Sequence, residues 1–187
     1  MAVIGNFLGA AGKNTINPSP GLEMHETELS LQSIVDPYAR ADFFLSFGPG
    51  GAEMEEGFIT FPTLPAGLLV KVGKMRTSFG RTNTQHPHVL PWTDRPLVTA
   101  NLVGGEEGIN DSGISVARLI PNSLFFLEAT GQVLSGNSGD VFQGSQRRDL
   151  SYIGRLRGYQ DITESTNIDI GASYAHGHND SGVVSGV

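Results

Sequence analysis

Apolar and polar residues alternate along most of this chain, and the alternation predicts β-strands. In residues 39–47 every second position is Ala, Phe or Leu, whereas the positions between them include Arg40 and Asp42. The same period of two recurs in residues 27–35, 125–133, 150–157 and 167–174. Such a period, with one apolar side, is typical of a strand whose two faces meet different surroundings.

Four further segments also predict strands, although their alternation is less regular: residues 2–9, 54–61, 67–76 and 112–120. Most of the resulting nine or so strands are about 8–12 residues long. Strands that cross a membrane need about 9–11 residues, whereas strands of soluble proteins centre on about 5–6. Strand length therefore favours a membrane protein.

The predicted connections alternate between short and long. The short ones are residues 36–37, 62–66, 122–123 and 160–163, and the long ones are residues 48–53, 77–111 and 135–148. Transmembrane β-barrels have tight turns at one end and long loops at the other. We therefore predict an all-β fold, an antiparallel up-and-down transmembrane β-barrel of which about nine strands are present, in one segment spanning residues 1–187. Because bacterial single-chain barrels have an even number of strands, we expect the chain to be a fragment of a longer barrel.

Charge and composition narrow the function classes. The formal net charge of −7 argues against nucleic acid as a partner, because phosphate binding needs clustered Lys and Arg. The chain has no cysteine and therefore no disulfide or thiolate metal site. Gly and Pro are frequent, at 25 and 10 residues, and the runs between them are short, as in all-β proteins. No apolar run reaches the ~18 residues of a membrane-spanning helix.

The polar sides of the predicted strands are charged. In a barrel these residues would line a wet lumen, where charges stay solvated or pair across strands; on a soluble sheet they would form the solvent face. The predicted lumen-wall residues are Glu28, Arg40, Asp42, Lys71, Glu128, Arg155, Arg157 and Asp169.

The middle of the chain resembles a known family. Residues 68–81, LLVKVGKMRTSFGR, are similar to the strand and following "PFG" loop of outer-membrane porins of the phosphate-selective and carbohydrate-porin kind, with Ser78 in place of the proline. The segments TQHPH (84–88), WTDRPLV (92–98), GGEEG (104–108) and strand 113–121 are similar to a porin-like outer-membrane family. The resemblance implies a passive channel for small hydrophilic solutes in the outer membrane of a Gram-negative bacterium. It implies outer-membrane lipid as surroundings and no cofactor, and it leaves a homo-oligomer open.

The resemblance also implies that one long loop folds inward and narrows the pore. Residues 77–111 form the only predicted connection long enough for this, and loops of this length are commonly functional. Rings of charged residues set ion preference in channels. The predicted constriction residues are Arg76, Arg81, Asp94, Arg95, Glu106 and Glu107. The alternative is a solvated surface loop.

Two histidine pairs are weak candidates for metal ligands: His86 with His88, and His176 with His178. Residues two apart on an extended chain lie on one side, where they could bind zinc or copper, but the sequence identifies no third ligand. We therefore predict no metal site.

The sequence contains no Gly-x-Ser-x-Gly, His-Glu-x-x-His or phosphate-binding Gly-Lys-Ser/Thr motif, so we predict no enzyme. Two alternatives to a channel stay open. One is a soluble β-sandwich that binds carbohydrate, and the other is an outer-membrane barrel with a structural or receptor role and no conduction.

Overall fold

In the computed structural model, nine strands form one antiparallel sheet in which each strand pairs with its neighbours in the chain. The structure describes residues 1–13, 21–92, 95–139 and 141–180. The sheet order is β1-β2-β3-β4-β5-β6-β7-β10-β11. The strands are β1 (Ala2–Gly9), β2 (Leu22–Asp36), β3 (Ala39–Gly48), β4 (Gly51–Leu64), β5 (Leu68–Arg76), β6 (Asn110–Leu119), β7 (Phe126–Leu134), β10 (Ser151–Thr163) and β11 (Thr166–His176). A separate two-stranded ribbon, β8 (Asn137–Ser138) with β9 (Phe142–Gln143), interrupts the connection from β7 to β10.

The prediction of an all-β, antiparallel fold is confirmed, but two predicted connections were wrong. Residues 48–53 were expected to form a longer loop, yet Gly48 pairs with Gly51 and the turn is only Pro49–Gly50. Gly51 has a positive φ of 114°, which lets the chain reverse within two residues. Residues 160–163 were expected to be a turn, but β10 continues to Thr163 and the turn is Glu164–Ser165. Gln160 and Asp161 are polar, yet they belong to the strand because they pair with Ile168 and Asn167 of β11.

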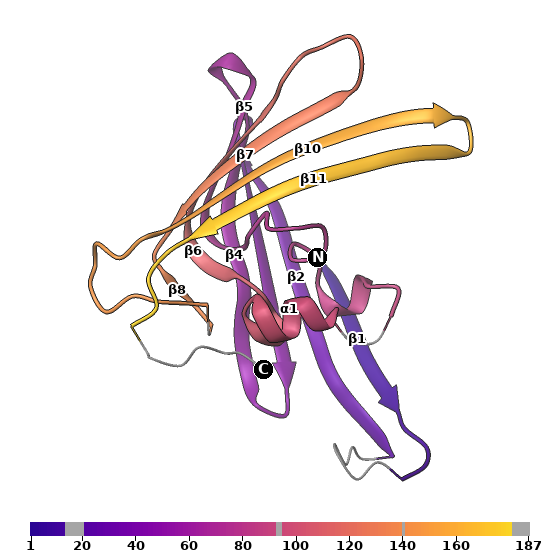
Figure 1. The fold of residues 1–187 in the computed structure, drawn as a ribbon. Helices are drawn as coiled ribbons and strands as arrows, with labels where there is room; N and C mark the ends of the chain where they lie inside the picture. The colour runs from indigo at the N-terminus through magenta and orange to yellow at the C-terminus, as the bar shows by residue number, and fades with distance from the viewer. Residues whose placement is uncertain (14–20, 93–94, 140, 181–187) are drawn as a thin grey trace.

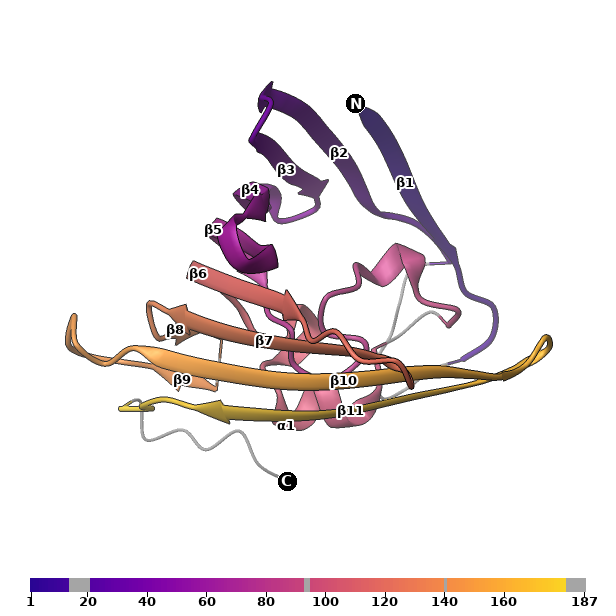
Figure 2. The same cartoon turned by 90° about the horizontal axis from the view of Figure 1, so that it is seen from above.

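The sheet is strongly curved. Seen from above, its strands stand side by side and form an open, curved wall (Figures 1 and 2). In the described part of the chain β1 and β11 are its two edges, so the sheet does not close into a barrel. Tight turns join the strands at one end of the wall, including Pro37–Tyr38 and Glu164–Ser165. At the other end, long connections join β5 to β6 and β7 to β10.

Two facing glycines mark a close approach between strands of the wall. Gly73 of β5 lies opposite Gly113 of β6. Gly73 has a φ of 140°, and a Cβ there would collide with the carbonyl oxygen of Gly57. A Cβ at Gly113 would collide in the same way with the carbonyl oxygen of Val133. Only glycine fits at these two positions.

The connection from β5 to β6 lies on the concave side of the wall (Figures 1 and 2). It was predicted to span residues 77–111, but β6 already begins at Asn110. The connection contains the short helix α1 (Leu97–Leu102) and single 3₁₀ turns at Pro87–Val89 and Gly105–Glu107. Pro96 precedes the helix and Gly104 follows it, as helix boundaries favour. No helix in the described residues is long and apolar enough to cross a membrane. We call residues 77–109 the interior loop.

A small apolar core closes one end of the concave side. It consists of Ile109 at the end of the interior loop, Leu134 of β7, Phe142 of β9 and Ile153 of β10. All four side chains are buried. This core fixes the interior loop and the β8–β9 ribbon against the wall. The rest of the concave face carries mostly polar and charged residues, with buried apolar side chains such as Phe58 and Met75 among them.

Candidate functional site

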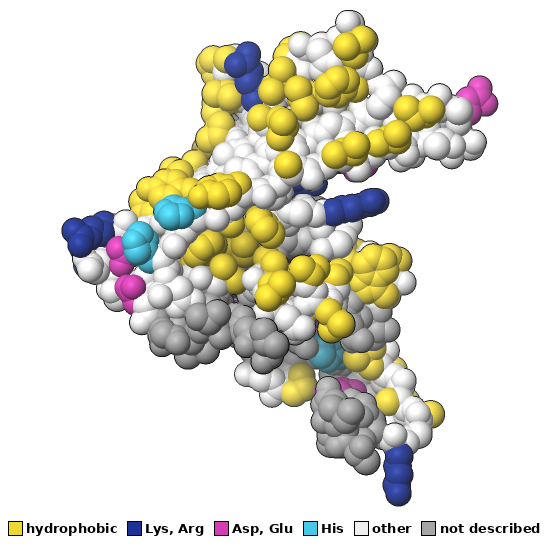
Figure 3. Space-filling model, viewed as in Figure 1, with side chains coloured by type: hydrophobic (Ala, Val, Ile, Leu, Met, Phe, Trp, Pro, Cys, Tyr) yellow, Lys and Arg dark blue, Asp and Glu magenta, His cyan; other side chains and the backbone are white. Residues whose placement is uncertain are grey.

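The convex face of the sheet is apolar, and no element in the described part of the chain covers it. The strand pairing aligns one row of side chains across six strands: Ala41, Ile59, Val72, Ile114, Val133 and Tyr152. Ile59, Val72, Ile114 and Val133 are 40–49% exposed, because no described element packs against them. Hydrophobic side chains also gather over β10 and β11 in Figure 3. Exposed apolar area on this scale is rare in soluble monomers and marks an interaction surface.

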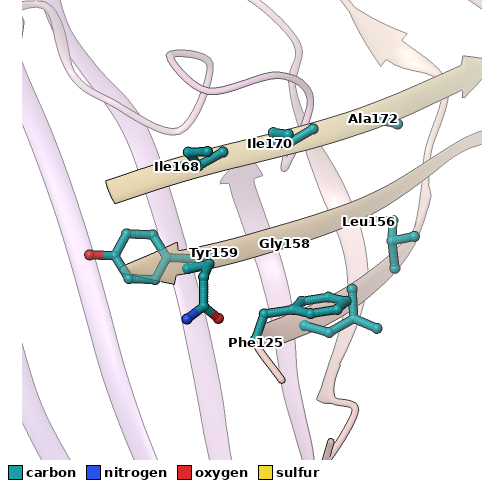
Figure 4. A pocket seen from close by; sticks show the side chains of 9 residues that line it. Phe125, Leu156, Gly158, Tyr159, Ile168, Ile170 and Ala172 are labelled. Atoms are coloured by element: carbon teal, nitrogen blue, oxygen red, sulfur yellow. The ribbon is translucent and has the colours of Figure 1, made fainter. Parts of the chain in front are cut away.

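The apolar face contains a shallow groove over β7, β10 and β11 (Figure 4). Leu156, Ile168, Ile170 and Ala172 line it from two neighbouring strands, and Phe125 closes it at one side. Gly158 forms part of the floor, where a larger side chain would fill the hollow. The groove therefore offers a mostly apolar surface, with Tyr159 and Gln160 as the polar residues of its lining.

The concave face is charged. By the strand pairing, all eight predicted lumen-wall residues lie on this one face. Some of their charges pair along it. The guanidinium of Arg157 lies 2.7 Å from the carboxylate of Asp169, and that of Arg40 lies 2.9 Å from Asp42. Asp42 is almost fully buried, which places a carboxylate inside the fold rather than on a solvent-facing surface.

A network of carboxylates surrounds Arg76 where the interior loop leaves β5. One guanidinium nitrogen of Arg76 lies 2.6 Å from a carboxylate oxygen of Glu55 on β4 and 2.6 Å from one of Glu107 in the interior loop. A third carboxylate, that of Glu56, lies 3.8 Å from the Nε atom of Arg76. The Arg76 side chain has no exposed surface. Burial costs less when a charge is paired in this way, so the cluster holds the loop to the wall.

His86 joins this network from the interior loop. Its Nδ1 lies 2.8 Å from Glu28 of β2 and 3.0 Å from Glu55, and its Nε2 lies 3.4 Å from Glu56. Burial opposes the charged imidazolium, but the carboxylates of Glu55 and Glu56 outweigh it and raise the pKa of His86 to about 9. The rings of His86 and His88 lie side by side, with centroids 5.6 Å apart and their planes tilted by 38°. We call Glu26, Glu28, Glu55, Glu56, Arg76, His86, His88 and Glu107 the interior cluster.

The structure places the predicted constriction residues in different surroundings. Arg76 and Glu107 meet in the interior cluster. Arg95 is buried within the loop, where it donates hydrogen bonds to the carbonyl oxygens of Thr82 and Gln85. Arg81 is exposed. Asp94 and the side chain of Glu106 lie outside the described part of the chain.

Glu55 and Glu56 are central to the cluster, and sequence reasoning did not select them. Neighbouring residues of a regular strand point to opposite faces, so alternation would send one of the two outward. Here Phe44 pairs with Glu56 and Leu45 pairs with Met54, so Glu55 is the extra residue of a β-bulge. Both side chains are consequently buried on the concave side. The sequence signal was the pair of adjacent carboxylates, Glu55-Glu56, within the strand.

The interior loop and the wall enclose a polar cavity of about 250 Å³. Lys71, Arg76, Glu56 and Glu128 line it together with neutral polar groups such as Gln132. Gln132 also accepts a hydrogen bond from the backbone N–H of Ser78 at the start of the loop. The cavity therefore places charges of both signs around a space that the loop narrows.

An uncharacterized protein of Aquifex aeolicus (strain VF5) is similar to this chain, with 35% identity over 174 residues. The alignment covers 87% of the chain and 36% of that protein, so the chain spans about a third of the length of this relative. No protein-family model and no solved structure matches the chain. Because the relative is itself uncharacterized, the function has to be argued from the two faces and the interior cluster.

Proposed function

We propose that the sheet is part of the wall of an outer-membrane β-barrel that acts as a porin-like channel for small hydrophilic solutes. One observation carries the proposal: the exposed convex face is apolar while the buried concave face is charged. Transmembrane barrels have this arrangement, with an apolar band toward lipid and a polar interior. In a soluble sandwich the apolar face would be covered by a second sheet. The described strands instead form one large sheet and a two-stranded ribbon.

The interior loop supports the constriction part of the proposal. Its contacts reach the concave face at separated strands: His86 approaches Glu28 of β2, Ser78 bonds to Gln132 of β7, and Gly80 bonds to Ser173 of β11. A loop fixed at several points across the wall narrows the interior. Arg76 and Glu107 would then lie beside the path of a solute and bias it by charge.

The same loop favours a second candidate, a barrel with a structural or receptor role and no conduction. The apolar core of Ile109, Leu134, Phe142 and Ile153 fills one end of the concave side. If further packing of this kind filled the remaining interior, the barrel would be plugged. Conductance separates the two candidates.

The test is single-channel recording on the protein expressed from its complete reading frame, purified in detergent and inserted into planar bilayers. We expect stepwise conductance. Glu107→Gln removes a carboxylate from the constriction, so the reversal potential in a KCl gradient should shift toward anion permeability.

The matched control is Glu164→Gln, which makes the same chemical change in the exposed β10–β11 turn and should leave the reversal potential unchanged. Membrane insertion without conductance steps would favour the plugged barrel. A protein that stays monomeric and soluble without detergent would contradict both candidates.

A further inference from the structure

We propose that Glu28, His86 and His88 form a binding site for a divalent transition-metal ion, of the zinc class, that fastens the interior loop to β2. The three residues offer ligand atoms that all lie within 4.8 Å of one another. Nδ1 of His86 lies 2.8 Å from Oε2 of Glu28, and Nδ1 of His88 lies 3.6 Å from the same oxygen. In a tetrahedral zinc site with bonds of about 2.0–2.1 Å, ligand atoms are about 3.3 Å apart. The two observed separations lie on either side of that value.

The local chain explains how two loop histidines come to face one strand residue. His86 precedes Pro87, and its φ of −71° and ψ of 150° are the extended conformation that a following proline favours. Pro87 then begins a 3₁₀ turn that contains His88. The turn brings the second ring back beside the first, with centroids 5.6 Å apart. Both rings are 11–12% exposed, so they lie at the edge of the interior rather than in its core.

The two closest ligand atoms of the site are both buried. Oε2 of Glu28 and Nδ1 of His86 face one another at 2.8 Å, and the Glu28 side chain is only 3% exposed. A protonated imidazole pairs with the carboxylate at this distance. Ligand imidazole is neutral, so a divalent ion would replace the proton of His86 and bind both atoms.

The charge around the site also favours a cation. Glu26, Glu28 and Glu55 offer carboxylate oxygens within 4.8 Å of one another, and Glu56 and Glu107 complete the acidic side of the cluster. Arg76 is the one arginine or lysine that pairs with these carboxylates in the interior cluster as described. A buried excess of negative charge is costly, and a divalent ion would reduce it.

The donor set selects the kind of metal. Two imidazole nitrogens and one carboxylate oxygen suit zinc, iron or nickel, whereas calcium and magnesium take oxygen ligands. Three protein ligands leave a coordination position open, so the site could also hold water or an anionic solute. The position of the site, between the loop and β2, points to a role in fixing the loop.

The second histidine pair provides an internal contrast. His176 and His178 have the same spacing in sequence, with ring centroids 6.4 Å apart. Among the described residues, however, neither belongs to a group of three possible ligands. The same sequence signal therefore gives a site at one place and none at the other, because only the first pair meets a carboxylate of the wall.

The test is metal binding by the purified full chain after removal of metal with EDTA. We expect calorimetric titration with Zn²⁺ to give one ion per chain, and Co²⁺ to give visible absorption bands that zinc abolishes. His88→Gln and Glu28→Gln should each weaken zinc binding at least about tenfold, because each removes one of three ligands. The Co²⁺ spectrum is a readout on the unaltered protein, so it does not depend on whether a variant folds.

The matched control is the double variant His176→Gln/His178→Gln, which should bind zinc like the unaltered protein. Stoichiometry below one ion per chain, or binding that survives both Glu28→Gln and His88→Gln, would overturn the proposal. His86 would then be an ordinary partner of the surrounding carboxylates. The measurement needs no conductance, so its outcome is independent of the proposed channel.

Discussion

In this sheet the exposed convex face is apolar and the concave face buries carboxylates, which is the reverse of the usual distribution in a soluble protein. Val116 and Ala117 are neighbours on β6, yet Val116 lies on the exposed convex face and Ala117 on the concave face beside the polar cavity. Across the sheet, apolar residues are exposed and carboxylates such as Glu28 and Asp42 are buried. The comparison teaches that residue type alone does not place a side chain inside or outside. What the face touches decides it, and here the apolar face lacks a partner within the described chain.

The largest effect is expected from removing the cation at the centre of the charged face. Arg76→Met leaves Glu55 and Glu56 buried without their guanidinium, which should lower the free energy of unfolding by about 3–5 kcal/mol. Denaturant unfolding in detergent would measure it. Arg157→Met is the control, because its ion pair with Asp169 is partly exposed and should contribute much less to the free energy of unfolding. Equal losses in the two variants would show that the interior cluster is not buried in solution.

The next largest effect compares adjacent residues on opposite faces. Val116→Arg places a charge on the convex face and should cost about 2–4 kcal/mol if that face meets the middle of a bilayer. Ala117→Arg places the same charge beside the cavity lined by Glu128 and should cost much less. Unfolding from lipid vesicles would measure both. If the two variants were equally stable, the faces would not differ in their surroundings.

A smaller effect on stability is expected from replacing glycines of the wall by alanine. Gly73→Ala forces a Cβ into the backbone of β4 at a φ of 140°, so it should destabilise the fold by about 1–3 kcal/mol. Gly131→Ala lies on the convex face with no atom within 4 Å of the new Cβ, so it should be neutral or slightly stabilising. The difference in denaturation midpoint tests the curvature of the wall. A harmless Gly73→Ala would mean that β4 and β5 approach less closely.

The smallest effect is the pH dependence of the contact between Ser145 and Asp180. The hydroxyl and backbone N–H of Ser145 donate hydrogen bonds to Asp180, and they hold the pKa of that carboxyl below 3.8. Because the pKa is lower in the folded state, the stabilisation is present above pH 3.8 and is lost as the pH falls through the lowered value. An NMR titration of the Asp180 carboxyl carbon measures it, with Ser145→Ala as control. A midpoint above 3.8 would show that this contact is absent.

The sequence predicts the strands well because a period of two records which residues share a face. All nine predicted strands are present, and the eight charged wall residues share the concave face. The bulge at Glu55 was not predictable, because it is a change of pairing with β3 that single-chain alternation does not record. The same holds for the meeting of Glu28 with His86 and His88, which depends on how residues 77–109 fold back. Interior contacts of a long loop are set by tertiary packing, and local patterns leave them open.

The central claim is that the convex face touches acyl chains. The chain has no cysteine, so single cysteines can be introduced one at a time along β7, from Phe126 to Leu134, and spin-labelled in lipid vesicles. We expect accessibility to oxygen, which dissolves in lipid, to be high at Leu127, Ala129, Gly131 and Val133. Accessibility to a water-soluble nickel chelate should be low at these four positions. A high nickel accessibility at the same positions, or the lack of any period of two, would contradict the account.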